Sequence, residues 1–387
     1  MDLKELQKHI RRLATLEESS DIVISCYLAL QNGRVVNGEA FSKRLRLLRA
    51  SVALEQLQGF DEAVDHIGEY LGSELSTESV GIAVFARGGV EPFFLPLQFQ
   101  VPVPDWIMGG PCPNIFHLVE LKDTYHRFVI LISTEEWARI LEVNLGEITQ
   151  ELWRERPELQ QRVKQGWSKE KYLRHRRHHS EKFFKEKIDV LEKLMAQGGH
   201  KHFLLAGSPR LTGQIRSLLP KHLSEKLIDT VSTSSGDKIP DIVRTAIEMF
   251  VEEEENDSRA VLDTLLDEFH GNGLGVAGIS STIRALHQGR VDVLVIAKGF
   301  EVETGWRCRH CQYIGENYQT TESCAECGLK DLEATELKEE MIRLAERTGC
   351  RVEVVNYDDR LIEFQGVGAL LRFNTQEEYG SRRAAVQ

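Results

Sequence analysis

Four cysteines near the end of this 387-residue chain have the spacing of a metal site. Two Cys-x2-Cys pairs are separated by twelve residues, and the pairs are formed by Cys308, Cys311, Cys324 and Cys327. Each pair places two thiolates on one turn, and the ribbon between the pairs can fold them face to face into a tetrahedron around Zn²⁺. Gly328 permits the tight backbone of the second turn. Because four cysteines leave no open coordination position for a substrate, the pattern predicts one structural zinc ion per chain.

Other interpretations of this cluster are a redox dithiol and an iron–sulfur site, and His310 could replace one ligand. The remaining cysteines, Cys26, Cys112 and Cys350, are expected to be buried small side chains. No segment approaches the roughly 20 apolar residues of a membrane span. The charged beginning of the chain lacks the apolar core of a signal peptide. We therefore expect a cytoplasmic protein without a membrane partner.

A second distinctive feature is a local excess of positive charge. The net charge of the chain is −12, but residues 162–187 contain ten Lys or Arg and three Glu. Such density on nearly every face of a helix is self-repulsive unless a polyanion is near. The pattern favours contact with RNA phosphates over a solvated charged helix. The basic residues assigned to RNA are Lys169, Lys171, Arg174, Arg176 and Arg177; the neighbouring Trp167 could stack on an unpaired base or pack onto its own domain.

The pattern of apolar residues predicts an α/β protein in which both chemical features lie on defined elements. Phe184, Ile188, Leu191 and Met195 form a helical stripe that follows the basic segment. Residues 115–121 are expected to form a strand, and the acidic run 252–257 a solvated helix end or linker. The predicted domains are an N-terminal α/β domain at 1–122, a middle domain at 123–264, and a C-terminal α/β domain at 265–375 with a zinc ribbon at 303–330, followed by a flexible tail at 376–387.

Several segments together resemble the archaeal and eukaryotic release-factor and Pelota family. LLAGSPRLTGQIRSLLP at 204–220 resembles a strand and helix of its middle domain. GVAGISSTIRALHQGRVDVLVIAKGF at 275–300 resembles the start of its third domain, and FQGVGALLRF at 364–373 its glycine-rich closing strand. The first domain resembles the divergent N domain of the bacterial branch, which includes ribosome hibernation factors. The resemblance implies a three-domain, release-factor-like architecture with the zinc ribbon inserted in the C-terminal domain.

Two departures bear on function. Release factors carry a Gly-Gly-Gln loop that positions water in the peptidyl transferase centre, whereas the matching stretch here is Gln165-Gly166-Trp167-Ser168, with Trp167 at the Gln position. The sequence also has no counterpart of the Asn-Ile-Lys-Ser loop that reads stop codons. The resemblance therefore implies a factor that binds the ribosomal A site in a tRNA-like pose, with Gln165, Gly166 and Trp167 along rRNA and no catalytic residue.

Such a factor would serve ribosome hibernation or protect stalled ribosomes, and a translational GTPase is a candidate second partner. One alternative is a peptidyl-tRNA hydrolase that acts on stalled ribosomes through Gln165. A weaker alternative is an RNA-binding protein that is independent of the ribosome.

Overall fold

The computed structural model describes residues 1–134, 137–155, 169–234, 236–300 and 304–374, with side chains except those of 153–155 and 169–180. These residues form two compact units. The N/C unit comprises Leu3–Thr124 and Glu254–Gln387, and the middle unit comprises Tyr125–Glu253. Both units contain helices and strands, so the α/β class is confirmed; the division into three domains stays a prediction. Within the described ranges, no helix has the length and apolar composition needed to cross a membrane.

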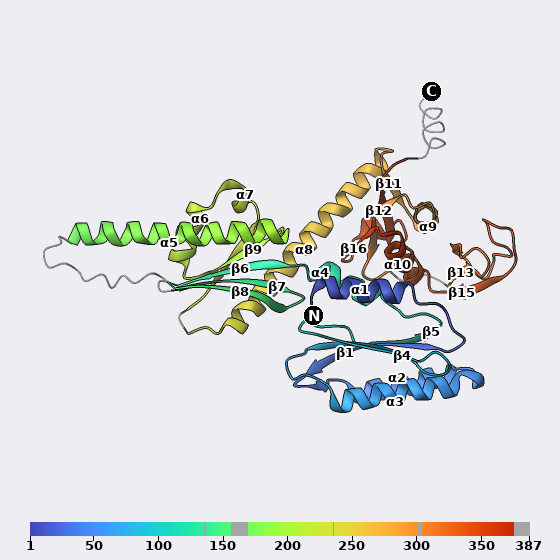
Figure 1. Ribbon diagram of the computed structural model, residues 1–387. Coiled ribbons are helices and arrows are strands. Elements are labelled where there is room, and N and C mark those ends of the chain that lie inside the picture. Colours follow the sequence, from blue (N-terminus) through green and yellow to red (C-terminus); the bar gives the residue numbers. More distant parts are fainter. Residues whose placement is uncertain (135–136, 156–168, 235, 301–303, 375–387) are drawn as a thin grey trace, which may run out of the picture. The chain divides into compact units, whose positions relative to one another are not determined.

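The first part of the N/C unit is an antiparallel sheet with the strand order β2-β1-β3-β4, and β5 also pairs with β1. Helices α2 and α3 cover one face of this sheet and α1 lies on the other (Figure 1). Because both faces are covered, β3 is buried along its whole length. The elements are α1 (Leu3–Ala14), β1 (Val23–Gln31), β2 (Arg34–Val35), α2 (Gly38–Ser51), a 3-10 turn (Leu54–Gln56), α3 (Leu57–Ser73), β3 (Gly81–Arg87), β4 (Phe93–Phe99), β5 (Trp106–Gly110) and α4 (Phe116–Thr124).

The second part of the N/C unit is a mixed sheet with the strand order β11-β17-β12-β16. β12 and β16 are parallel, and parallel neighbours need a long crossover connection. That crossover contains a three-stranded ribbon with the four clustered cysteines, followed by α10. The elements are the second half of α8 (Ile239–His270), β11 (Gly275–Ala277), α9 (Ile279–His287), β12 (Val291–Ala297), α10 (Leu337–Thr348), β16 (Arg351–Val355), α11 (Asp359–Ile362) and β17 (Val367–Leu371).

The middle unit has a five-stranded sheet with the order β10-β9-β6-β7-β8. One core lies between this sheet and α5, and a second lies on the α8 side. The predicted α5 stripe is buried in the first core, as expected from its spacing. The elements are β6 (Phe128–Ser133), β7 (Trp137–Asn144), β8 (Glu147–Glu155), α5 (Lys169–Gly198), β9 (Phe203–Gly207), α6 (Pro209–Leu218), α7 (Lys221–Ser224), β10 (Leu227–Ser232) and the first half of α8.

Two expectations from the sequence are wrong. Residues 115–121 were expected to be a strand, but they belong to α4 and the turn before it. The first N–H groups of a helix need acceptors from outside the helix. Here Glu339, remote in sequence, accepts hydrogen bonds from the backbone N–H groups of Ile115 and Phe116, at 2.8 and 3.1 Å, and so stabilises the helix over a strand.

The acidic run 252–257 is not a linker either, because α8 continues through it. Glutamate is a good helix former, and the run contains no glycine or proline to interrupt the helix. Ser258, one residue later, is buried and donates to Glu353 at 2.7 Å, which fixes this part of α8 on the C-terminal sheet. Strand β8 was not expected, because its side chains are mostly polar.

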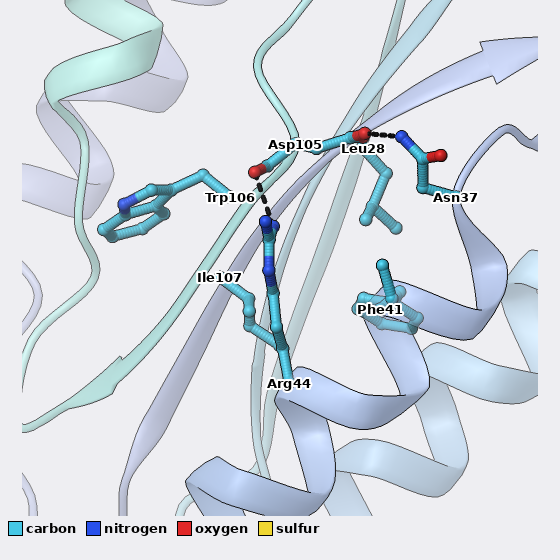
Figure 2. Close-up of a pocket in the computed structure, with 8 residues that line it drawn as sticks. Leu28, Asn37, Phe41, Arg44, Asp105, Trp106 and Ile107 are labelled. Atoms are coloured by element: carbon cyan, nitrogen blue, oxygen red, sulfur yellow. Dashed lines mark hydrogen bonds between the residues drawn. The ribbon is translucent and has the colours of Figure 1, made fainter.

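A polar contact fixes α2 on the edge of the N-terminal sheet (Figure 2). Asp105, just before β5, accepts from the backbone N–H of Ala29 at 2.9 Å and from the side chain of Asn37. Its backbone carbonyl accepts from Arg44 of α2 at 2.6 Å. The cavity beside these groups has a volume of about 40 Å³, which leaves room for about one water molecule and excludes a larger ligand. The contact therefore has a structural role: it attaches α2 to the sheet.

Candidate metal centre

The ribbon is a small antiparallel sheet with the order β14-β13-β15. Its strands are β13 (Gly305–Cys308), β14 (Ile314–Gly315) and β15 (Leu332–Thr335). Cys308 is the last residue of β13, and its backbone N–H donates to Tyr313 at 2.9 Å. This turn presents Cys308 and Cys311 on the same side of the ribbon.

The second cysteine pair lies on a turn with the same hydrogen bonds as the first. The backbone N–H of Cys324 donates to Leu329 at 2.8 Å, and that of Gly328 donates back to Cys324 at 2.9 Å. Gly328 has a φ of +73°, a left-handed conformation that glycine adopts without strain. The tight turn predicted at Gly328 is therefore present.

The two turns bring all four sulfur atoms within 4.8 Å of one another. The Sγ atoms of Cys308 and Cys327 are 3.6 Å apart, and those of Cys311 and Cys324 are 3.5 Å apart. A tetrahedron with metal–sulfur distances of about 2.3 Å has edges of about 3.8 Å, so the cluster has nearly the size that Zn²⁺ requires. The geometry therefore fits a metal ion bound by four thiolates.

Backbone N–H groups favour thiolates at this cluster. The N–H of Cys311 hydrogen-bonds to the Cys308 sulfur and lowers the pKa of that thiol to about 7. The N–H of Glu326 donates to the Cys324 sulfur at 3.4 Å. Hydrogen bonds to the charged form stabilise it, and metals bind the thiolate rather than the thiol. The turns thus favour the thiolate at Cys308, whereas burial raises the pKa of Cys311 to about 12, and the pKa of Cys327 is raised as well.

The cluster rests on a small aromatic core that spacing alone did not reveal. Trp306 is buried beside Cys308 and Cys324, and Tyr313 packs against this group. Tyr313 also stacks on His287 of α9, with ring centroids 4.3 Å apart. The backbone N–H of Ile314 donates to Nε2 of the same histidine at 3.2 Å. His287 therefore connects the ribbon to the C-terminal sheet and must present an unprotonated Nε2.

A buried arginine forms the second attachment of the ribbon. Arg307 of β13 points away from the cysteines and pairs with Glu18, with Glu333 at 2.9 Å and with Glu340 of α10 at 3.4 Å. Glu18 precedes β1, so the ribbon is joined to elements from both parts of the N/C unit. Strand alternation predicts that Arg307 and Cys308 face opposite sides, but no local signal identifies carboxylates so remote in sequence.

The structure does not test the predicted RNA contacts. Gln165, Gly166 and Trp167 lie outside the described residues. Lys169, Lys171, Arg174, Arg176 and Arg177 lie on the helical backbone of α5, and their side chains are outside the described part. The second half of α5 is firmly anchored through the buried Phe184, Leu191 and Met195. In Figure 1 the first half of α5 extends beyond the end of the middle sheet.

Comparison with known proteins gives matches of two kinds. Residues 113–251 match the family described as bacterial archaeo-eukaryotic release factor family 10. Peptide chain release factor subunit 1 of Pyrococcus abyssi is 23% identical, over 96% of this chain and 98% of that protein. The protein of the same name from Thermococcus onnurineus is 22% identical, over 97% and 99%.

Similar solved structures include an archaeal translation termination factor and Pelota. The termination factor is 17% identical, with a TM-score of 0.27 and coverage of 96% of this chain and 99% of the other. Pelota of Archaeoglobus fulgidus is 13% identical, with a TM-score of 0.38 and coverage of 97% and 93%.

We predict that the purified protein contains about one equivalent of zinc and that Cys308→Ser loses it, because three thiolates bind zinc far more weakly than four. Metal analysis of both proteins checks this, and hydrogen exchange should show loosening confined to the ribbon. Cys112→Ser, outside the cluster, is the matched control and should retain the metal. Undiminished zinc in a variant lacking all four cysteines would refute the assignment.

We also predict that acid weakens the attachment of the ribbon at His287. Burial lowers the pKa of His287, an effect that Arg347 adds to and Glu326 opposes. The contribution of His287 to stability is therefore fully present above about pH 6.5, the pKa of an unfolded histidine, and declines as the pH falls below it.

The measurement is the protection factor of the Ile314 amide at about pH 7.5 and 5.5, with zinc content monitored. His287→Gln is the control, since its amide oxygen can accept the hydrogen bond and does not titrate. The prediction fails if protection in the wild-type protein is unchanged, or if the variant loses as much.

Proposed function

Because the chain carries a domain of the bacterial archaeo-eukaryotic release factor family and is homologous along its length to archaeal peptide chain release factor subunit 1, we propose that it is a ribosome-binding translation factor. It occupies the A site in a tRNA-like pose and serves hibernating or stalled ribosomes without reading stop codons. The observation that carries the proposal is an alignment covering 96% of this chain and 98% of the archaeal protein, which extends well beyond the family domain.

The basic segment supplies the contact with rRNA in this proposal. At 1.5 Å per residue, the 30 residues of α5 span about 45 Å. The buried stripe holds the second half of the helix, so the basic first half is carried as a rigid extension. Phosphates attract Lys and Arg. In a chain with a net charge of −12, residues 162–187 carry a local excess of seven positive charges, and those outside the buried Lys187 direct binding through this segment.

The proposal includes one Zn²⁺ ion with a structural role. Thiolate ligands in a tetrahedral set are typical of structural zinc, and a closed shell of four cysteines leaves no position for substrate or water. Cys308, Cys311, Cys324 and Cys327 would hold one ion and fix the ribbon between His287 and Arg307. A factor of this kind works in the cytoplasm, and a translational GTPase is a partner to test.

Peptidyl-tRNA hydrolysis is the second candidate function. Ester hydrolysis needs a positioned water and stabilisation of developing charge. The Gly166 backbone could orient water, but Trp167 is bulkier than the Gln that release factors carry at this position. The Ser168 hydroxyl is suited to cap α5. These residue types favour binding over chemistry.

We predict that ribosome binding depends on charge in the first half of α5. Reversing Arg174, Arg176 and Arg177 to Glu should weaken co-sedimentation with 70S ribosomes strongly and reduce its salt dependence, because each phosphate contact contributes close to one unit of log–log slope. The matched control reverses the exposed Lys201, Lys221 and Arg244, which are in the same unit, and should bind normally. Equal affinity and slope in both triple variants would place the binding surface elsewhere.

We predict no peptide release above background when the protein is added to ribosomes carrying P-site peptidyl-tRNA. Trp167→Ala should reduce binding and leave this background unchanged, because the indole contributes contact and no chemistry. A release assay with a bona fide release factor as the positive control provides the measurement. Stoichiometric or repeated release that disappears on changing Gln165 or Gly166 would instead establish the hydrolase.

A further inference from the structure

Helix α2 packs one face on the N-terminal core and leaves a second, mixed face exposed. The inner face packs partly buried side chains onto the N-terminal core: Phe41, Leu45, Leu48 and Val52. The outer face contains the exposed Ala40, Lys43 and Leu47, and the exposed Val36 lies two residues before the helix begins. The side chains of Val36, Leu47 and the following Leu54 are 51%, 64% and 87% exposed. A helix covering a sheet needs only the inner stripe, so Leu47 and the charged side chains around it are available for a partner.

The outer face of α2 is held rigidly. Arg44 and Asn37 bind Asp105 at the sheet edge (Figure 2). Arg49 forms two hydrogen bonds with Asp61 of α3, at 2.7 and 2.6 Å. The two helices therefore form one layer in a fixed relation, and a partner meets both of them.

The charges of this layer are segregated by helix. α2 carries four basic residues and one acidic residue, whereas α3 carries four acidic residues and no Lys or Arg. Lys43 and Arg46 are exposed on α2, and Asp65 and Glu69 are exposed on α3. An RNA or an acidic protein would be attracted by α2 and repelled by α3. A partner for the whole layer needs an acidic row and a basic row of its own.

We propose that this partner is a second copy of the chain. A two-fold axis parallel to the helices and midway between them places α2 of each copy against α3 of the other, which is an isologous contact. Lys43 and Arg46 then face the carboxylates of Asp65 and Glu69 on the other copy. The side chain of Leu47 is buried at the same contact. Gly68 and Gly72 lack side chains and so leave space for it near those carboxylates.

The size of the layer sets the strength of the association. Helices of 14 and 17 residues are about 21 and 26 Å long, and two packed helices are about 20 Å wide. The layer thus offers about 500 Å² per copy and about 1,000 Å² in total, at the lower end of specific interfaces. An interface of this size makes a weak, reversible dimer, so that concentration and ionic strength control it.

The test is sedimentation equilibrium of the full-length protein over a wide concentration range. The wild-type protein should show a monomer–dimer equilibrium that weakens as salt rises. Leu47→Asp should weaken dimerisation about tenfold or more, since a two-fold contact contains the change twice. Lys43→Glu with Arg46→Glu should weaken it, and so should Asp65→Lys with Glu69→Lys. A chain that carries all four substitutions should dimerise again, because α2 is then acidic, α3 is basic, and opposite charges face each other across the contact.

Leu329→Asp is the matched control, because this exposed ribbon leucine undergoes the same chemical change away from the layer. It should leave the equilibrium unaltered. The proposal is overturned if the wild-type protein stays monomeric at all concentrations. A monomer that binds an RNA or an acidic protein through α2 would overturn it in the same way. It is also overturned by a dimer insensitive to Leu47→Asp, or by charge-exchanged chains that remain monomeric. No ribosome enters this experiment, so its outcome is independent of the proposed function.

Discussion

The N/C unit depends on a row of charged side chains along one helix, α10. Glu339 caps the start of α4, Arg343 donates to the carbonyls of residues 14 and 16, and Glu346 accepts from Lys122 at 2.8 Å. All three side chains are buried, and burial raises the pKa of Glu339 to about 8. A buried charge is costly unless it is paired, so each contact is satisfied in one docking arrangement and lost in others. Segments more than 200 residues apart in sequence are joined in this way.

The same row explains how the ribbon is held. Glu340, one residue after Glu339, reaches Arg307 in the strand that ends at Cys308. The ribbon buries few apolar side chains of its own and cannot supply much stability from its core. A metal ion would crosslink its two turns, while Arg307 and His287 orient it. Metal binding would therefore be coupled to attachment of the ribbon. A bound ion would hold the two cysteine turns together, and Arg307 and His287 would keep the ribbon on the N/C unit.

The middle unit holds α5 on its sheet partly through a buried lysine. The anchored half of α5 contains Lys187, which is fully buried and donates to Ser133 at 2.7 Å. Its ammonium also lies over the rings of Phe183 and Phe184, 3.8 and 4.9 Å from their centroids. The ring contacts lie within α5, whereas the bond to Ser133 of β6 joins the helix to the sheet.

The sequence by itself determined the features that depend on short-range spacing. Two Cys-x2-Cys pairs sufficed to predict the four-sulfur cluster, because each turn is local and a short ribbon joins them. The stripe from Phe184 to Met195 predicted which side of α5 is buried, because helical periodicity is independent of what covers it. The class of the fold followed from the same periodicities.

Tertiary structure decided what depends on partners remote in sequence. Residues 115–121 suit a strand or a helix equally well by pattern, and the remote carboxylate of Glu339 made them a helix. The acidic run in α8 looks by composition like a solvated segment. The contact between Ser258 and Glu353, which holds this part of the helix on the C-terminal sheet, is not visible in the sequence. Arg307 and His287 gain their roles only when β13 and α9 come together. Charge–charge and cap contacts act over a few ångströms in space, and a linear sequence does not encode which distant residues will be brought that close.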